Sequence, residues 1–403
     1  MLSIPLPKVR FRDNPRIAMK ALSSSSAVAA LAVLSLAACG RKEETIVLGV
    51  AAPLQMANGK SVQMAAEMAV DEINKKLAGT GRTFALEIRD DEKSEKKGIE
   101  VARDLRENEK VVAVIGHVNS AVSIKAAPIY NMPAGEQDSI LGDPVVQISP
   151  ASSAPALTGA GPWTFRVTPT DLEFSPVLAR HARERLGSSK AAVIYANDEY
   201  GQGVTSTFAA AFRRQGGQIV SSDPYLPDIL KNPAALDPYL VRAIRRGADA
   251  LVIGGQADAG VPIIQAARRL GYTGPILGAD GLTGVKDARG VGEGVFVSSA
   301  FLPDHDTPAA QKFVAAFRAR YKTSPDHRAA QTYDIVYLLY EAITKVGPDR
   351  EAIRGYLEQV GRPGGHPAFD GVSGTIKFDE NGDVVEKPVV IGVVRGSELV
   401  TAR

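Results

Sequence analysis

The sequence predicts an α/β protein built from two Rossmann-like lobes, each with a parallel sheet covered by helices. Short apolar runs alternate with amphipathic helical segments, which is the pattern of βαβ units. The alternation stops near residue 148 and begins again near residue 191. The chain has 403 residues, whereas a single hydrophobic core seldom grows beyond about 250–300 residues.

The first run of elements predicts one lobe. Residues 59–77 carry apolar side chains at the 3.6-residue period of a core-facing helix, and residues 94–108 form a charged helix. Four short apolar runs have the length of strands: residues 46–50, 84–88, 111–115 and 145–148.

The second run repeats the pattern and predicts the other lobe. Its strands are residues 191–195, 218–220, 250–253, 275–277 and 295–297, and its helices are residues 203–215, 233–246 and 259–270. Further helices are predicted over residues 309–321, 329–345 and 350–360. Asn381-Gly382 lies between two last strands, residues 375–378 and 389–394, and predicts a hairpin.

The N-terminal residues predict export and a lipid anchor. Residues 21–38 carry no charge and follow Lys20, as in a secretory signal. Leu36-Ala37-Ala38-Cys39-Gly40 resembles the bacterial lipobox, in which the cysteine is lipidated. Residues 1–38 are therefore predicted to be a signal peptide, with translation starting at Met1 or Met19, and residues 39–44 a lipidated tether. A plain signal peptide and a single membrane-spanning helix are the alternatives.

Composition and motifs exclude several classes of function. The net charge is +2, but residues 1–38 carry five basic residues and one acidic residue, so the rest of the chain has a net charge of −2 and nucleic acid is not an expected partner. Gly201-Gln202-Gly203 lacks the third glycine of a dinucleotide site, because Ser206 takes its place. Residues 379–383 resemble the start of a calcium loop, but Val384 replaces the required glycine. We therefore expect no enzyme activity, no cofactor and no metal.

Polar residues follow three predicted strands and suit a free amino acid. Ser120 and Ser153 can donate hydrogen bonds to a carboxylate, with help from N–H groups where helices begin. Asp280 follows residues 275–277 and can pair with an ammonium group. Each residue alone also fits a purely structural role, since serines cap helices and Asp-Gly forms turns.

Together these segments resemble the leucine/isoleucine/valine-binding proteins of ABC transporters, which have the type I periplasmic-binding fold. The resemblance covers most of residues 45–395 and is clearest over residues 66–74, 115–117, 149–153, 198–203 and 378–383. It implies that Ser120 and Ser153 bind the ligand carboxylate, while the Ala151 carbonyl and Asp280 bind the ammonium. It also implies that Tyr200, on the second lobe, closes over the ligand.

Three residues and one segment depart from the branched-chain pattern. Asn58 and Gln256 stand where such proteins often place aromatic residues, and Asn119 is polar too. Residues 132–143 look like an insertion. These changes argue against a leucine-like ligand side chain but not against an amino acid.

The resemblance also implies how the chain divides. Lobe 1 is expected to comprise residues 45–167 plus 299–384, and lobe 2 residues 168–298 plus 385–403. A three-strand hinge is expected near residues 166–169, 298–302 and 384–387.

The expected function is that of a periplasmic or cell-surface lipoprotein that captures an amino acid, branched-chain or related, between two lobes and delivers it to an ABC transporter permease. The alternatives are the same fold with an amide, urea-like or aromatic ligand, and a ligand sensor in place of a transport receptor.

Overall fold

The computed structural model describes residues 44–133, 135 and 142–402. The expected signal peptide, the lipidation site Cys39 and residues 134 and 136–141 of the expected insertion lie outside the described residues. Within the described ranges, no helix combines the length and the apolar character needed to cross a membrane.

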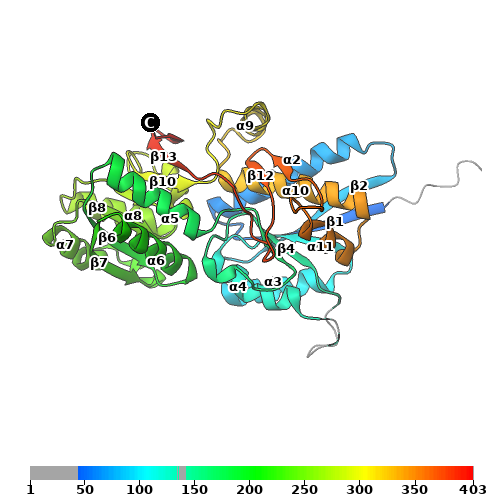
Figure 1. Cartoon of the computed structure of the whole chain (residues 1–403), viewed down its shortest axis with the longest axis horizontal. Helices are drawn as coiled ribbons and strands as arrows, with labels where there is room; N and C mark the ends of the chain where they lie inside the picture. The colour runs from blue at the N-terminus through cyan, green and yellow to red at the C-terminus, as the bar shows by residue number, and fades with distance from the viewer. Residues whose placement is uncertain (1–43, 134, 136–141, 403) are drawn as a thin grey trace, which may run out of the picture. The chain divides into compact units, whose positions relative to one another are not determined.

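Among the described residues, five parallel strands form the first sheet, in the order β2-β1-β3-β4-β5. The strands are β1 (Glu44–Ala52), β2 (Arg82–Asp90), β3 (Val111–Ile115), β4 (Val146–Ser149) and β5 (Thr164–Arg166). Helices α2 (Ala57–Lys76), α10 (His327–Val346) and α11 (Arg350–Glu358) pack on one face. Helices α3 (Glu95–Glu107) and α4 (Ser120–Asn131) pack on the other (Figure 1).

The second sheet follows the order β7-β6-β8-β9-β10 and then adds β13 and β14. Its strands are β6 (Lys190–Ala196), β7 (Gln218–Tyr225), β8 (Ala250–Gly254), β9 (Ile276–Gly278), β10 (Phe296–Ser299), β13 (Val390–Arg395) and β14 (Glu398–Thr401). Helices α5 (Asp171–Arg180) and α6 (Glu199–Arg214) cover one face. Helices α7 (Asp237–Arg245) and α8 (Ala257–Arg269) cover the other.

The alternation of side chains along the strands explains why both faces of a sheet are covered. In β6, Ala191 and Val193 pack against α5 and α6, whereas Ala192 and Ile194 pack against the opposite helices. A strand buried on both faces is apolar throughout, because successive side chains point to opposite faces. The remaining elements are α9 (Pro308–Tyr321), β11 (Phe369–Gly371), β12 (Gly374–Ile376) and short helical turns at Pro155–Leu157, His181–Arg185, Pro227–Lys231, Pro233–Leu236 and Asp280–Asp287.

The α/β fold in two lobes with parallel sheets is confirmed, but two details differ from the sequence prediction. The second sheet ends in two antiparallel strands, since β13 runs antiparallel to β10 and β14 to β13. The predicted hairpin is wrong, because β12 pairs with β11 and β13 pairs with β10. The Asn381-Gly382 turn does form, with Asp379 N donating to Asp383 O at 2.9 Å, but it closes only a short bridge between Phe378 and Val384.

Helices α4 and α5 were not identified in the sequence. Each contains a proline, Pro128 in α4 and Pro176 in α5, and proline in a helix interior weakens the local helical signal. Both helices nevertheless form, because each packs against a sheet. α4 matters most, because Ser120 is its first residue.

Both sheets have a reversal of strand order, the feature at which open α/β sheets bind ligands. In each, the first strand lies between the second and the third, so consecutive connections leave to opposite sides at β1/β3 and at β6/β8. Ligands of open α/β sheets bind outside the carboxyl ends of strands at this point. The segments after β1 and β3 therefore lie around such a point in the first sheet, and those after β6 and β8 around the corresponding point in the second.

A buried ion pair fastens residues 382–384 to β5. Arg166, which is 1% exposed, donates from Nε to Asp383 Oδ1 at 2.6 Å and from Nη2 to Asp383 Oδ2 at 2.8 Å. The backbones pair as well, since Arg166 N donates to Gly382 O and Val384 N donates to Arg166 O. Arg166 Nη1 also donates to the carbonyl oxygens of Ser152 and Ala154, at 3.1 and 2.8 Å.

Replacing Asp383 with alanine should strongly destabilise the fold. It leaves the Arg166 guanidinium buried without its carboxylate, and such a loss typically costs about 3–5 kcal/mol. In the variant, two carbonyl oxygens still accept hydrogen bonds from Arg166. We therefore expect the loss in the free energy of unfolding, measured by a urea titration, to lie at the lower end of that range. Asp228→Ala removes an exposed ion pair with Lys231 and should leave the unfolding midpoint unchanged. Equal midpoints for Asp383→Ala and wild type would contradict this role.

Candidate functional site

The structure places the predicted site residues at the carboxyl ends of strands in both sheets. Asn58 lies in the first turn of α2, after β1. Asn119 and Ser120 begin α4 after β3, and Ala151 and Ser153 follow β4. From the second sheet, Tyr200 lies in the first turn of α6, Gln256 precedes α8, and Asp280 follows β9.

Asp280 is the centre of the polar contacts in the site. It is 1% exposed, and its Oδ1 accepts hydrogen bonds from Tyr200 Oη at 3.1 Å and from Ser153 Oγ at 3.5 Å. Gly281 N donates to Tyr200 Oη at 2.7 Å. A Cβ atom at residue 281 would lie 2.4 Å from Tyr200 Oη, so glycine is required for the tyrosine to come this close. The Asp-Gly pair thus holds Tyr200 in close contact and does more than form a turn.

The segments after β3 and β4 meet beside this centre. Ser120 Oγ accepts a hydrogen bond from Ala154 N at 3.3 Å. Ala151 is buried, and Asn119 is buried with no hydrogen-bond partner for either end of its amide within the described part of the chain. A buried amide without partners is costly, which makes Asn119 a candidate for contacts with a bound molecule or water.

Asn58 and Gln256 hydrogen-bond to each other from different sheets. Asn58 Nδ2 donates to Gln256 Oε1 at 3.2 Å, although 198 residues separate the two. Both line a cleft of about 590 Å³. The other six site residues predicted from the sequence are buried, and they are not among the residues lining this cleft.

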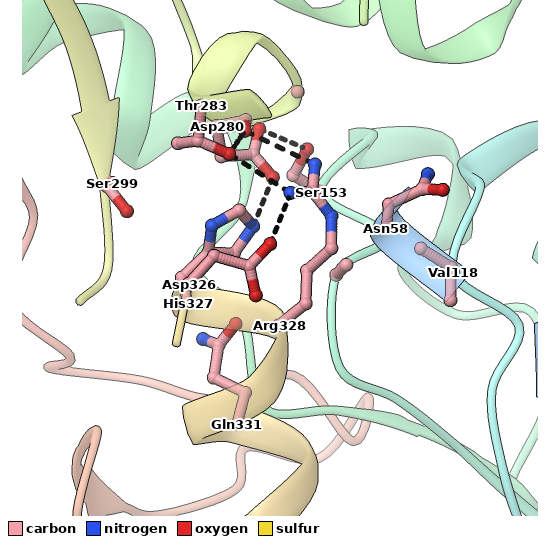
Figure 2. A network of polar contacts seen from close by, with 12 residues as sticks. Asn58, Val118, Ser153, Asp280, Thr283, Ser299, Asp326, His327, Arg328 and Gln331 are labelled. Carbon is pink, nitrogen blue, oxygen red and sulfur yellow. Dashed lines mark hydrogen bonds and ion pairs between the residues drawn. The ribbon is translucent and has the colours of Figure 1, made fainter. Parts of the chain in front are cut away.

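Sequence reasoning missed the first turn of α10, which supplies His327 and Arg328 (Figure 2). Arg328 Nη1 donates to Thr283 Oγ1 at 3.0 Å and to Asp326 Oδ2 at 3.1 Å, and Arg328 Nη2 donates to Asp280 O at 3.3 Å. His327 Nε2 lies 3.6 Å from Asp280 Oδ2, beyond hydrogen-bond distance. No motif marks these residues, because α10 is far from Asp280 in sequence and its period predicts only a core helix.

Asp171 was missed as well. It is 0% exposed, and neither of its carboxylate oxygens has a hydrogen-bond partner among the described residues. Its backbone N donates to Ser153 O at 2.8 Å, and a Cβ atom at Gly203 would lie 2.5 Å from Asp171 Oδ2. Gly203 therefore makes room for a buried carboxylate, which gives the Gly201-Gln202-Gly203 segment a role in packing.

Burial controls the electrostatics of the site. Loss of water raises the pKa of Asp280 to about 6, although the Arg328 charge and the hydrogen bond from Tyr200 oppose the shift. Burial and the neighbouring Asp280 raise the pKa of Asp171 well above its usual value. Burial and the Arg328 charge lower the pKa of His327 to about 3, so this imidazole is neutral at physiological pH. Two unfavourably buried carboxylates suit a site that receives a cation.

A buried hydrogen-bond chain supports the segment that carries Asn119 and Ser120. Asp91 Oδ2 contacts His117 Nδ1 at 2.8 Å, and Tyr130 Oη contacts His117 Nε2 at 3.2 Å, with all three residues 0% exposed. The carbonyl oxygen of His117 accepts from Ser149 Oγ at 2.6 Å, which ties the ends of β3 and β4 together.

The calcium-like residues 379–383 have structural roles. Asp379 Oδ1 accepts hydrogen bonds from Asn381 N and Asp383 N, both at 2.9 Å, and Asp383 pairs with Arg166. No group of three or more potential metal ligands occurs in the part of the chain that the structure describes.

Comparison with known proteins identifies the family. The model of the periplasmic binding protein family matches residues 46–398. The Leu/Ile/Val-binding protein homolog 1 of Brucella abortus is 26% identical over 366 residues, covering 89% of this chain and 92% of that protein.

Two solved structures have the same fold. An ABC transporter substrate-binding protein from Desulfitobacterium hafniense in complex with Leu has a TM-score of 0.72 and 30% identity, covering 89% of this chain and 100% of the other. The leucine-binding protein LivK from Thermotoga maritima has a TM-score of 0.76 and 26% identity, covering 89% and 98%. The family comprises extracytoplasmic solute-binding proteins of ABC transporters and not enzymes. This chain belongs to the periplasmic binding protein family.

Proposed function

We propose that this protein captures a free amino acid between its two lobes and presents it to the permease of an ABC transporter. The observation that carries the proposal is the buried carboxylate of Asp280, surrounded by hydroxyl groups from both lobes. A buried carboxylate without a cationic partner is unfavourable, and the ammonium group of an amino acid is a partner of the right charge.

The neighbouring groups suit the rest of an amino acid backbone. Ser120 and Ser153 carry hydroxyl groups, and Ser120 stands at the N-terminus of α4, where free N–H groups favour a carboxylate. The carbonyl oxygen of Ala151 can accept a second ammonium hydrogen. Tyr200 and Asp280 come from the second sheet, so a bound amino acid would touch both lobes at once.

Contacts between the lobes support a clamp. Asn58 and Gln256 join α2 to the start of α8, and Lys93 Nζ lies 2.7 Å from Asp258 Oδ2. We propose lobe 1 as residues 45–167 plus 299–384 and lobe 2 as residues 168–298 plus 385–403, with three hinge segments between them. A ligand that contacts both lobes favours the closed form, because some of its contacts exist only there.

Replacing Asp280 with asparagine should weaken amino-acid binding at least tenfold. The substitution keeps the size and one hydrogen-bond acceptor but removes the charge that pairs with the ammonium. Truncating a partner of a buried charge pair typically costs about 2–5 kcal/mol, and each 1.4 kcal/mol is about tenfold in affinity. The measurement is calorimetry with the amino acid that gives the largest thermal shift among the twenty common ones.

The control ligand is the same molecule without its amino group, the deaminated acid, which keeps the carboxylate but has no ammonium to pair with Asp280. The control variant is Asp228→Asn, at an exposed position. Asp280→Asn should leave the weak binding of the deaminated acid nearly unchanged, and Asp228→Asn should bind both like wild type. Equal losses for the two ligands, or no loss for the amino acid, would show that Asp280 does not bind the ammonium.

We propose further that the protein is a lipoprotein of the bacterial cell envelope, attached through Cys39 after removal of residues 1–38. The support is the sequence Leu36-Ala37-Ala38-Cys39-Gly40 after an apolar segment. Cys39→Ala should move the protein from the detergent phase to the aqueous phase in a detergent-partition assay on cells. Wild-type protein in the aqueous phase, or Cys39→Ala protein still in the detergent phase, would contradict lipidation.

A further inference from the structure

The cleft beside the Asp280 centre contains a buried cation that the amino-acid backbone does not need. Arg328 is 4% exposed and lines the cleft of about 590 Å³ together with Asn58, Lys60, Ser61, Gln256 and Asp326. Figure 2 shows its side chain extending from α10 toward Asp280 and Thr283. Arg328 thus contacts Asp280, the residue proposed to hold the ammonium, and also lines the cleft.

Arg328 has hydrogen-bond donors to spare. A guanidinium group has five N–H donors, and three hydrogen bonds use Nη1 twice and Nη2 once. Nε has no partner among the residues that the structure describes. The free Nε–H and the second Nη2–H form one edge of the planar group, which is the arrangement that binds a carboxylate with two parallel hydrogen bonds.

The cleft lining contains equal numbers of acidic and basic residues: Asp258, Asp287, Asp326, Lys60, Lys286 and Arg328. Each acidic residue of the lining has a cationic partner: Asp326 pairs with Arg328, Asp287 with Lys286 at 2.7 Å, and Asp258 with Lys93 at 2.7 Å. Lys60 lies on the exposed rim, and within the described residues it has no ion pair. Asp326 keeps its negative charge, since the Arg328 charge lowers its pKa to about 2 against the opposing effect of burial.

We infer that the ligand is a small amino acid whose side chain ends in a carboxylate, and that Arg328 binds this carboxylate through its Nε and Nη2 edge. The inference rests on the proposed function, because Asp280 and the serines must hold the backbone of the ligand. Arg328 Nη2 already contacts the carbonyl oxygen of Asp280, so a short side chain is enough to reach from one group to the other.

An apolar side chain satisfies fewer polar groups of this cleft than a carboxylate does. A leucine-like group would leave the Nε–H of Arg328 unpaired, as it is among the described residues of the free protein, whereas a carboxylate would recover the cost of an unpaired buried donor, about 1–3 kcal/mol. It would also desolvate the amides of Asn58 and Gln256 without offering them new hydrogen bonds. A ligand carboxylate accepts from Arg328 and can accept from these amides as well.

Calorimetric titrations of the purified protein with L-aspartate, L-glutamate, L-glutamine and L-leucine test the inference. We expect wild type to bind one of the two acidic amino acids at least tenfold more tightly than glutamine or leucine. Arg328→Met, which keeps a long side chain without the charge, should lower the affinity for that acidic ligand at least tenfold more than it lowers the affinity for leucine, because the altered pKa of Asp280 affects both ligands alike. Arg328→Lys should lie between, because lysine lacks the planar fork.

Arg269→Met removes an exposed arginine of α8 and is the control that should bind like wild type. Tighter binding of leucine or glutamine by wild type would overturn the inference and leave the proposed function standing. An equal loss for every ligand in Arg328→Met and Arg328→Lys would overturn it too, by showing that Arg328 only supports the site. Failure of wild type to bind any amino acid would overturn the inference together with the proposed function. If Arg328→Met does not fold, the ligand selectivity of wild type and the affinities of Arg328→Lys for the same ligands test the inference.

Discussion

The ion pair between Arg166 and Asp383 connects the fold to the site more directly than any apolar contact does. The Arg166 guanidinium binds the side chain of Asp383, a residue more than two hundred positions away in the sequence. Its Nη1 also donates to the carbonyl oxygens of Ser152 and Ala154. Those carbonyls flank Ser153, whose hydroxyl group contacts Asp280. The segment after β4 therefore keeps its conformation because a buried charge fixes it to the returning chain. A buried pair of this kind adds little net stability, but it specifies one arrangement, since no other placement satisfies both charges.

The site itself places ionisable side chains where water is excluded. Asp171 and Asp280 are both buried, and burial raises the pKa of each. Arg328 partly compensates Asp280, while neutral His327 adds no positive charge. In this setting a ligand ammonium would replace the water that Asp280 loses on burial. A ligand carboxylate would accept the hydrogen bonds that Arg328 does not otherwise make. The same groups that make the empty site unfavourable would then make the occupied site selective.

Much of the fold could be predicted from the sequence, because strands buried on both faces read as apolar runs and core helices repeat every 3.6 residues. β3, at Val111–Ile115, was predicted to the residue. The hairpin at Asn381-Gly382 failed because the turn signal is local, whereas β13 finds its partner in β10 through the tertiary fold. The gathering of Ser153, Tyr200 and Asp280 could be anticipated from strand ends and from resemblance. Asp171 and Arg328 could not, because their importance arises from missing hydrogen-bond partners, which no sequence pattern records.

The proposed function requires the two lobes to close around the ligand. Small-angle X-ray scattering of the purified protein, with and without a saturating amino acid, measures this closure. We expect the ligand to reduce the radius of gyration, and we expect the double variant Ser153→Ala, Asp280→Ala to show no response at the same ligand concentration. A ligand that binds tightly in calorimetry yet leaves the scattering of the wild-type protein unchanged would contradict the clamp.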